Sequence, residues 1–407
     1  MHNTRQVTDG IFWVGGSDRR LALFENLFPV PDGVSYNSYL ILDEKTALVD
    51  TVDSSITRQF LENVASVLDG RPLDYLVVNH MEPDHCANIE ELSRLYPQMQ
   101  IVGNAKTFQM IDQFYSFRLT DRTVTVKEND TLSLGRHTLR FVFAPMVHWP
   151  EVMMTYDEED KLLFSADAFG AFGSLDGFLF GDELTPPQRL LPEMRRYYGN
   201  IVGKYGPQVQ AVLKKASGLD IQTICPLHGP VWRGDFGWVL AAYDKWSRYE
   251  PEEQSVAVLY GSMYGDTQNA AEILATGLTE AGIKGVRVYD LSKTHLSYLI
   301  AEVFRCSHLV LAAPTYNNGI YPAMHTFISD MQALNLQNRT VGLIENGSWA
   351  PQSGKLMRQA LEGMKDMRVL PETVSIRSSV KEAQLQSIET LKQQILETLS
   401  RDVVSRC

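Results

Sequence analysis

The sequence predicts an α/β protein of two domains, an αββα sandwich followed by a doubly wound parallel sheet. Three observations indicate this architecture. The chain has 407 residues, more than a single hydrophobic core usually holds. Short β-rich segments broken by turns fill the first part, whereas strands and helices alternate regularly from Gln254 onward. A short polar linker with one proline, residues 249–254, separates the two patterns, so we expect domains at residues 1–250 and 254–407.

Residues 1–250 are expected to form short strands and helices in mixed order. Runs of β-branched and aromatic residues predict strands at 34–42, 46–50, 73–79, 100–103, 123–127, 138–143, 153–157 and 162–165. Helical periodicity predicts helices at 55–68, 88–96, 187–205 and 209–217. This order suits an αββα sandwich, in which loops at the sheet ends carry the functional residues.

From residue 254 onward, five strands alternate with five helices. The expected strands are 255–260, 286–290, 308–313, 340–345 and 369–376. The expected helices are 267–281, a segment near 295–305, segments that begin at 322 and 354, and 381–399. This alternation predicts a parallel, doubly wound sheet of flavodoxin type, which binds ligands beyond the carboxyl ends of its strands.

The composition is that of an ordinary globular protein, with 21% charged and 44% hydrophobic residues. The formal net charge of −12 argues against a nucleic-acid binder, because such binding depends on clustered positive charge. No apolar run approaches the roughly 18 residues of a membrane-spanning helix, so we expect no membrane segment. The polar N-terminal segment lacks the apolar stretch of a signal peptide, so we expect a cytoplasmic protein.

The four cysteines, Cys86, Cys225, Cys306 and Cys407, are scattered without any close pair. A disulfide scaffold and an all-thiolate metal centre are therefore not expected. The same absence argues against a built-in electron carrier of the iron–sulfur type.

Four potential metal ligands lie within six positions of the segment NHMEPDH, residues 79–85, directly after an expected strand. A loop can splay alternate side chains, so His80, Glu82 and Asp84 are expected to point toward one cavity, with His85 on a second face of it. The alternative is a polar surface loop whose histidines have no role.

Three further ligand types favour the metal site. His148, Asp167 and His228 each follow an expected strand, at the sheet edge where a layered α/β fold collects its site residues. The other five histidines do not fit this pattern and are expected at the surface or in packing: His2, His137, His295, His308 and His325.

The spacing of these seven ligands resembles that of the metal ligands in the flavodiiron proteins. The motif H-x-E-x-D-H is followed by His148, Asp167 and His228 after 62, 18 and 60 intervening residues, and the resemblance covers essentially the whole chain. It implies a metallo-β-lactamase-like fold for the first domain. The related zinc hydrolases usually carry histidine where this chain has Glu82. The exchange makes the site richer in carboxylate, which suits iron better than zinc.

The resemblance also implies a role for each ligand in a centre of two irons. His80, Glu82 and His148 would hold one iron, and Asp84, His85 and His228 the other. Asp167 would bridge both through its two carboxylate oxygens. In some members of the family the histidine that matches His85 turns away and water replaces it. The same resemblance places Tyr198 near the irons.

A second site is expected at the start of the helix that follows strand 255–260. The segment GSMYGDTQN, residues 261–269, offers backbone N–H groups and the positive end of a helix dipole to a phosphate. It is neither a Walker loop nor the G-x-G-x-x-G of dinucleotide binders. The alternative is an ordinary helix start capped by Asp266 or Thr267.

Two later strand ends favour a flavin. The segments PTYNNG (314–319) and NGSW (346–349) lie where a doubly wound sheet binds its ligand, and Tyr316 and Trp349 are expected to pack against an isoalloxazine ring. The site resembles a flavodoxin-type FMN site. The expected cofactor-binding residues are Ser262, Met263, Tyr264, Gly265, Asp266, Thr267, Pro314, Thr315, Tyr316, Asn317, Gly319, Gly347, Ser348 and Trp349.

A metal pair and a flavin in one chain imply electron transfer from FMN to iron. The resemblance implies an oxidoreductase that reduces dioxygen to water, nitric oxide to nitrous oxide, or both. The chain lacks the C-x-x-C pairs of a fused rubredoxin, so we expect an external donor, either rubredoxin or a reduced deazaflavin. The resemblance further implies a head-to-tail homodimer or a dimer of such dimers.

Two other functions stay open at the level of the sequence. One is a dinuclear metal hydrolase of the metallo-β-lactamase superfamily with an accessory flavodoxin-like domain, since a zinc pair could activate water without a flavin. The other is a pure electron-transfer or binding protein. An iron content of about two per chain would favour the oxidoreductase over the hydrolase. Turnover of either gas would exclude the pure electron-transfer or binding protein.

Overall fold

The computed structural model describes residues 2–117 and 122–404, and Cys407 therefore lies outside the described residues. The chain forms two compact units. The first comprises the chain up to Tyr198 together with Pro207–Tyr243, and the second comprises Gly199–Gly206 and the chain from Asp244. The short segment Gly199–Gly206 thus groups with the C-terminal unit although the sequence places it among the N-terminal residues.

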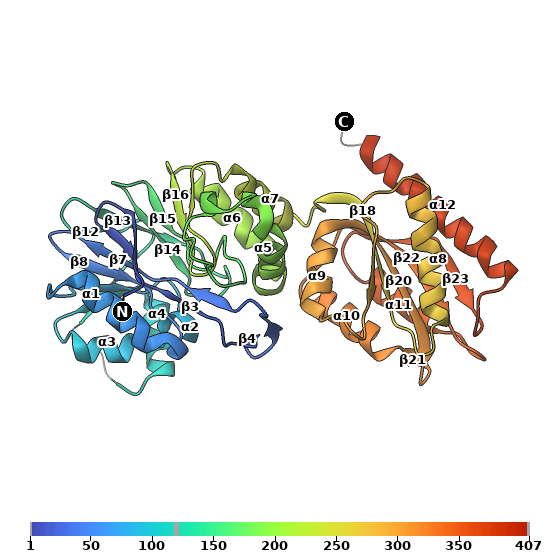
Figure 1. The fold of residues 1–407 in the computed structure, drawn as a ribbon, viewed down its shortest axis with the longest axis horizontal. Helices are drawn as coiled ribbons and strands as arrows, with labels where there is room; N and C mark the ends of the chain where they lie inside the picture. Colours follow the sequence, from blue (N-terminus) through green and yellow to red (C-terminus); the bar gives the residue numbers. More distant parts are fainter. Residues whose placement is uncertain (1, 118–121, 405–407) are drawn as a thin grey trace. The chain divides into compact units, whose positions relative to one another are not determined.

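Two sheets form the centre of the N-terminal unit (Figure 1). The first has the order β1 (Arg5–Thr8), β2 (Ile11–Trp13), β7 (Tyr39–Leu42), β8 (Thr46–Val49), β9 (Tyr75–Val77), β10 (Gln100–Gly103), β11 (Thr123–Thr125). The second has the order β12 (Thr131–Ser133), β13 (Thr138–Phe143), β14 (Met153–Asp157), β15 (Leu162–Phe164), β16 (Thr223–Cys225), β17 (Trp232–Arg233). Strands β8 to β11 run parallel, and so do β15 and β16, whereas the other neighbours are antiparallel.

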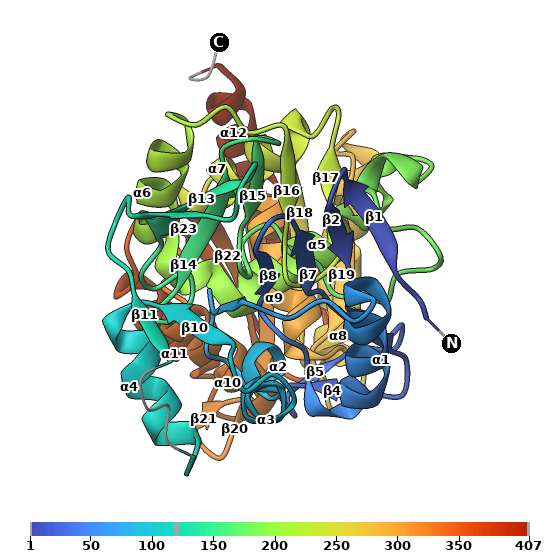
Figure 2. The same ribbon diagram turned by 90° about the vertical axis from the view of Figure 1, so that its left-hand side faces the viewer.

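Apolar side chains of both sheets meet between them, including the buried Tyr39, Val77, Phe141 and Phe164. The helices α1 (Thr57–Leu68), α3 (Ile89–Leu95) and α4 (Ala105–Phe114) lie beside the first sheet, and α5 (Leu191–Tyr197), α6 (Gly206–Ala216) and α7 (Gly237–Ser247) lie beside the second (Figures 1 and 2). The expected αββα sandwich of metallo-β-lactamase type is therefore confirmed.

The expected strand 34–42 is in fact two strands. Residues Val34–Tyr36 form β6, which pairs with β3 (Gly16–Asp18), and β7 begins only at Tyr39. Between them the buried side-chain amide of Asn37 donates to the carbonyl oxygens of Pro226 (2.9 Å) and Gly229 (2.8 Å). These bonds hold Asn37 against the loop around residues 226–229, and the strand is interrupted there.

The expected helix 187–205 is also interrupted. It consists of a 3₁₀ turn (Pro187–Leu190), α5, a π-helical turn (Tyr198–Val202) and a second 3₁₀ turn (Gly203–Tyr205). The helices α4 and α7 were not expected from the sequence, and neither were several short strands, among them β1, β2, β12 and β17. Strands of two to four residues show too few alternations to be recognised.

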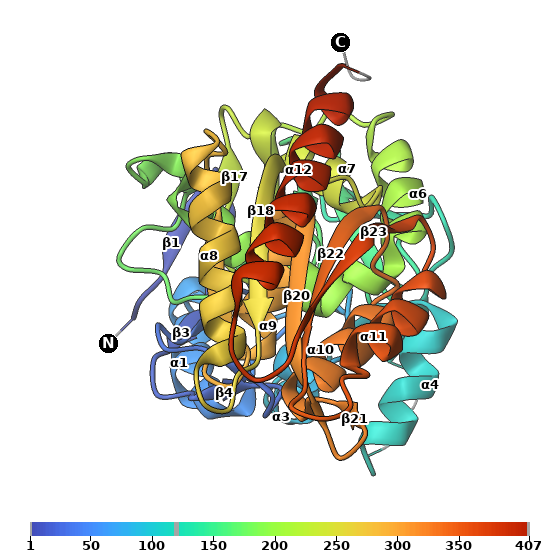
Figure 3. The same ribbon diagram turned by 90° about the vertical axis from the view of Figure 1, so that its right-hand side faces the viewer.

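The C-terminal unit contains a parallel sheet in the order β19 (Arg287–Asp290), β18 (Glu253–Tyr260), β20 (Cys306–Tyr316), β22 (Arg339–Asn346), β23 (Met367–Ile376). Helices α8 (Asp266–Glu280) and α12 (Glu382–Val404) cover one face, and α9 (Leu296–Arg305), α10 (Pro322–Ala333) and α11 (Ser353–Glu362) cover the other (Figures 1 and 3). This is the 2-1-3-4-5 order of a flavodoxin-like doubly wound sheet, as expected.

Strand β20 is longer than expected. It runs through Pro314–Tyr316 and turns back through a hairpin at Asn317 and Asn318 to pair with β21 (Gly319–Ile320). Both asparagines have positive φ, 50° and 58°, which asparagine tolerates better than most residues. Within the described residues, no helix is both long enough and apolar enough to cross a membrane.

Candidate metal centre and flavin pocket

The fold brings all seven predicted ligands together as two adjoining groups in the N-terminal unit. One group is His80, Glu82, His148 and Asp167, and the other is Asp84, His85 and His228. His80 and Glu82 follow β9, Asp84 and His85 lie in the short helix α2 (Pro83–Cys86), and the other three follow β13, β15 and β16. The ligands therefore sit at the ends of strands from both sheets.

The first group is compact. His148 Nε2 lies 2.9 Å from Glu82 Oε2 and 3.3 Å from His80 Nε2. His80 Nε2 lies 3.2 Å from the same Glu82 oxygen. Two ligand atoms about 2.1 Å from a common ion and at right angles to one another are about 3.0 Å apart, so these separations suit a single ion.

The second group has the same spacing. His85 Nε2 lies 3.0 Å from His228 Nε2, and Asp84 Oδ2 lies 3.3 Å from His85 Nε2 and 3.2 Å from His228 Nε2. Asp167 joins the two groups. Its Oδ2 lies 3.3 Å from His80 and 3.1 Å from His148, whereas its Oδ1 lies 3.2 Å from His85 and 3.7 Å from His228. One carboxylate oxygen thus faces each group.

The donor set fits a pair of iron ions. All seven residues are buried, none more than 8% exposed, and both oxygens of Asp84 and Oδ1 of Asp167 have no hydrogen-bond partner among the described residues. Buried charged oxygens without partners are costly unless a cation compensates them. Three carboxylates with four imidazoles form a mixed oxygen and nitrogen set that suits iron.

The ligands also perturb one another's protonation. Burial alone would raise the pKa of the Asp167 carboxyl, but the neighbouring imidazoles of His85, His80 and His148 hold it well below its usual range. Burial would lower the pKa of His148, yet Asp167 and Glu82 raise it to about 9. Cations bound here would displace the protons that these imidazoles carry, so metal affinity is expected to fall in acid.

Main-chain contacts fix the loop that carries four of the ligands. Asp50, buried at the end of β8, accepts hydrogen bonds at Oδ1 from the N–H groups of Asn79 (2.7 Å) and His80 (3.2 Å). Burial raises the pKa of the Asp50 carboxyl to about 6. The hydroxyl and the N–H of Thr51 both donate to the carbonyl of His85 at 2.8 Å. The loop is therefore held at both of its ends.

Several residues around the centre had no signal in the sequence. His80 Nδ1 donates to Glu151 Oε1 at 2.8 Å, and His228 Nδ1 donates to the Ser35 carbonyl at 2.7 Å. The rings of Phe24, Tyr36 and Tyr197 lie 5.3–5.7 Å from the His228 ring, measured between centroids. The pKa of the buried Tyr197 hydroxyl is well above its usual range because of burial and the nearby carboxylates.

The two neighbouring tyrosines differ in their contacts. Tyr197 packs against His228, whereas Tyr198, which the resemblance placed near the irons, packs against Tyr243 at 5.0 Å between centroids. Tyr197 is the last residue of α5, and the π-helical turn begins at Tyr198.

Glu25 lies at the tip of the hairpin formed by β4 (Leu23–Phe24) and β5 (Phe28–Pro29). Glu25 and Asn26 both have positive φ, 51° and 54°, and they are the central residues of a β-turn in which the Leu27 N–H donates to the Phe24 carbonyl at 2.9 Å. Residue Glu25 as a whole is exposed, yet its carboxyl lies beside that of Glu82, and loss of hydration together with this neighbour raises the pKa of Glu25 to about 8. Strained non-glycine residues often occur at functional sites.

A third cluster of possible ligands is structural. His137, which was expected in packing, donates through Nδ1 to Asp157 Oδ2 at 2.9 Å, and the nearby Asp160 already pairs with the Arg136 guanidinium at 2.8 Å. The arginine supplies the positive charge that a metal would bring.

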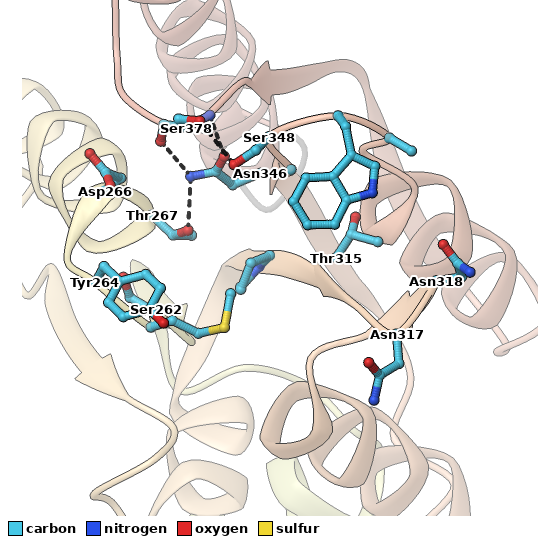
Figure 4. Close-up of a pocket in the computed structure, with 15 residues that line it drawn as sticks. Ser262, Tyr264, Asp266, Thr267, Thr315, Asn317, Asn318, Asn346, Ser348 and Ser378 are labelled. Carbon is cyan, nitrogen blue, oxygen red and sulfur yellow. Dashed lines mark hydrogen bonds between the residues drawn. The ribbon is translucent and has the colours of Figure 1, made fainter.

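The C-terminal unit contains a cavity of about 720 Å³ at the carboxyl ends of its strands (Figure 4). Eleven of the fourteen predicted flavin residues line it: Ser262, Met263, Tyr264, Asp266, Thr267, Pro314, Thr315, Asn317, Gly347, Ser348 and Trp349. Four lining residues were not singled out from the sequence: Asn318, Asn346, Ala350 and Ser378. The cavity is large enough for an isoalloxazine ring and its ribityl phosphate.

Hydrogen bonds tie the loops of this cavity together. Asn346 Nδ2 donates to Thr267 Oγ1 (3.3 Å) and to the Ser378 carbonyl (2.9 Å), as Figure 4 shows. Gly265, with φ of 98°, precedes α8, and its N–H donates to Ser262 Oγ at 3.0 Å. Trp349 is 86% exposed at the rim, so its ring can pack against a bound flavin.

Three predicted flavin residues lie outside the cavity lining: Gly265, Tyr316 and Gly319. Tyr316 and Gly319 pair across the β20–β21 hairpin, and the Tyr316 ring lies 6.3 Å from that of Tyr321. Contact between Tyr316 and a flavin therefore stays a prediction. Thr315 does line the cavity, but its hydroxyl accepts from the N–H groups of Gln352 and Ser353, which places it at the start of α11.

Known protein families match both units. Residues 34–229 match the family described as ODP family beta lactamase, and residues 258–384 match flavodoxin. Both matches fall on the elements that carry the two sites.

Named relatives extend over both units. A nitric oxide reductase of Moorella thermoacetica is 32% identical over 363 residues, covering 88% of this chain and 90% of that protein. The solved structure of rubredoxin oxygen:oxidoreductase from Desulfovibrio gigas has a TM-score of 0.92 and 29% identity, and the match covers 98% of this chain and 100% of that one. A flavodiiron protein of Giardia intestinalis has a TM-score of 0.87 and 25% identity, covering 98% of each chain.

Proposed function

Since this chain belongs to the flavodiiron proteins, an oxidoreductase family with a diiron centre and FMN, we propose that it reduces nitric oxide to nitrous oxide, dioxygen to water, or both. The observation that supports this most directly is the pairing of two matched ligand groups around Asp167 with a flavin-sized cavity in the same chain. The relatives named as nitric oxide reductase and as oxygen oxidoreductase share both units with this chain.

When bound, the irons would supply one-electron chemistry toward the gas, and FMN would pass electrons to them. The protein's own residues do the rest. Each group of two imidazoles and one carboxylate would hold one iron, and Asp167 would keep the two ions at a fixed separation. The aromatic rings around His228 exclude bulk water, and the Tyr197 hydroxyl, buried beside the ligands, can donate a hydrogen bond to a bound gas.

The dinuclear hydrolase is the weaker alternative. Glu82 stands in the first ligand group where a zinc hydrolase would use histidine, and the chain carries a complete flavin cavity that hydrolysis does not need. The pure electron-transfer protein is weaker too, because it would not require seven buried ligands.

An external donor is part of the proposal. A small redox protein such as rubredoxin, or a reduced deazaflavin, would reduce the FMN. The name of the Desulfovibrio gigas relative includes rubredoxin, which favours the former. The cytoplasmic location that the sequence suggests stays a prediction.

The assembly is proposed to be a head-to-tail homodimer, alone or paired into a tetramer. Each protomer would then place its flavin beside the irons of its partner, and twofold symmetry would repeat the contact. This proposal is supported by the location of the metal ligands in one unit of the chain and of the flavin cavity in the other.

Steady-state turnover tests the activity. The iron-loaded, FMN-loaded protein is mixed with chemically reduced rubredoxin and either nitric oxide or dioxygen, and gas consumption is followed with an electrode. Consumption of at least one gas, with about two irons per chain by elemental analysis, is the expected result. A loaded protein that consumes neither gas would contradict the proposal.

A further inference from the structure

The ligand sets of the two metal positions are formally equal. Each consists of two imidazoles, one terminal carboxylate and one oxygen of Asp167. Ligand charge alone therefore does not distinguish the two ions. Any difference between them must come from the groups that contact the ligands.

The hydrogen bonds that the imidazoles make outside the two groups differ in charge. In the first group, the imidazole of His80 donates from Nδ1 to a carboxylate, Glu151, at 2.8 Å. In the second group, His228 donates from Nδ1 to the peptide carbonyl of Ser35 at 2.7 Å, and His85 Nδ1 has no hydrogen-bond partner among the described residues. Hydrogen bonds to an ionised acceptor are roughly twice as strong as those to a neutral one.

Glu151 is well placed to act on His80. Its side chain is fully buried, and the same Oε1 also accepts from the Met81 N–H at 2.8 Å. The Glu151 carbonyl accepts from Asn104 Nδ2 at 2.6 Å, and Asn104 in turn caps α4. Burial would raise the pKa of the Glu151 carboxyl, but the bonds from His80 and Met81 lower it, so the group carries its charge at neutral pH. The side chain of Asp50, by contrast, accepts hydrogen bonds only from main-chain N–H groups of this loop, and its charge acts on both His85 and His80, one imidazole from each group.

We propose that Glu151 is a positioning residue that makes the two irons unequal: by polarising His80, it stabilises the ferric state of the iron held by His80, Glu82 and His148. The iron held by Asp84, His85 and His228 is then the easier one to reduce. When the diferric centre accepts one electron from the flavin, that electron resides on the second iron and the first stays ferric. This inference rests on the proposed function, because it requires iron in both positions.

The consequence is a defined order within the site. The iron that becomes ferrous first is the one beside Phe24, Tyr36 and Tyr197, whose rings surround His228. A gas that binds to ferrous iron would then first meet the ion held by Asp84, His85 and His228.

The test is a redox titration of the iron-loaded protein, followed by the electron paramagnetic resonance signal of the mixed-valent centre. Glu151→Gln keeps the size of the side chain but removes its charge. Relative to the wild type, the variant is expected to show its second reduction at higher potential, while its first reduction moves less. The mixed-valent signal then reaches a lower maximum. An unchanged separation of the two steps in a variant with two irons would overturn the proposal.

The control is Asp157→Asn, which removes the charge from a similar buried pair, His137 and Asp157, away from the metal ligands. This control is expected to leave both potentials unchanged, and an equal shift there would show that the effect is not local to His80. If Glu151→Gln fails to hold two irons, Glu151→Asp is titrated instead. Its shorter carboxylate lengthens the hydrogen bond, so a reduced separation supports the proposal and a wild-type separation overturns it.

The outcomes are distinguishable from a failure of the proposed function. If the wild type holds no iron or consumes neither gas, the function itself is wrong. If the wild type turns over and shows two reduction steps that Glu151→Gln leaves unchanged, only the role of Glu151 is wrong.

Discussion

Asp167 is the residue on which both metal positions depend, because its two oxygens face different ligand groups. We predict that Asp167→Ala lowers the iron content well below two per chain and abolishes gas reduction, while FMN stays bound in the other unit. Elemental analysis, flavin absorbance and turnover are measured on the same sample. Two irons with normal turnover would show that Asp167 is not the bridge.

Trp349 provides a second test at the scale of the residue. Its ring is 86% exposed at the rim of the flavin cavity, where a bound isoalloxazine would cover it. Aromatic packing contributes about 0.5–1.5 kcal/mol beyond buried area, so Trp349→Ala is expected to weaken FMN binding about 2- to 10-fold with iron content unchanged. Fluorescence titration of apoprotein with FMN measures this. Equal FMN affinity in wild type and Trp349→Ala would remove Trp349 from the site.

At the scale of the element, His308 joins β20 to α12. Its Nε2 lies 3.0 Å from Thr398 Oγ1 and its Nδ1 lies 2.9 Å from Ser307 Oγ, and burial, with Arg368 nearby, lowers its pKa to about 4. In the unfolded chain the pKa of histidine is about 6.5, so as the pH falls the unfolded state takes up a proton before the folded state does. The neutral, buried form therefore contributes stability above about pH 6.5 that is lost progressively down to about pH 4.

We accordingly predict that the C-terminal unit loses about 3 kcal/mol of unfolding free energy between pH 7 and pH 4 through this one group. Denaturant unfolding, followed by flavin release and circular dichroism, measures the loss. In His308→Gln the same pH interval is expected to cost less, because glutamine does not titrate. Identical pH dependence in the two proteins would refute the assignment.

A helix cap provides the other prediction at this scale. Asn104 Oδ1 accepts from the N–H groups of Lys106 and Thr107 at the start of α4, and its amide holds the Glu151 carbonyl. Asn104→Ala is expected to cost about 1–2 kcal/mol of unfolding free energy and to weaken iron binding. His295→Ala, which removes the cap of α9 in the other unit, is the matched control, expected to leave iron binding unchanged. Equal iron affinity in wild type and Asn104→Ala would separate the cap from the metal site.

At the scale of the whole molecule, the proposed dimer predicts complementation. A metal-dead variant (His80→Ala with Asp167→Ala) and a flavin-dead variant (Thr267→Asp, whose charge repels the phosphate) are each expected to be inactive. Random pairing makes about half of the dimers mixed, with one working flavin–iron pair of two, so co-expression is expected to restore about a quarter of wild-type activity. Heterodimers found by native mass spectrometry without turnover would show that electrons do not cross the interface.

Local pattern alone determined much of this protein. The alternation after residue 254 predicts a doubly wound sheet, because each βα unit is contiguous in sequence. The motif of residues 79–85 places four ligands in one loop, and the other three follow strand ends, so the spacing alone predicts the seven side chains that the structure brings together. The flavin loops are likewise short segments at strand ends, and most of their predicted residues line the cavity.

Only the tertiary structure decided which groups surround those ligands. Glu151 lies 71 residues from His80, and the Ser35 carbonyl 193 residues from His228, so no local pattern indicates either contact. The break at Asn37 likewise depends on carbonyl groups about 190 residues away. The ligands themselves could be predicted because they lie directly after strands, and hydrophobic periodicity indicates in the sequence where those strands end. The groups that polarise them are chosen by packing between the two sheets, which arises only when the chain has folded.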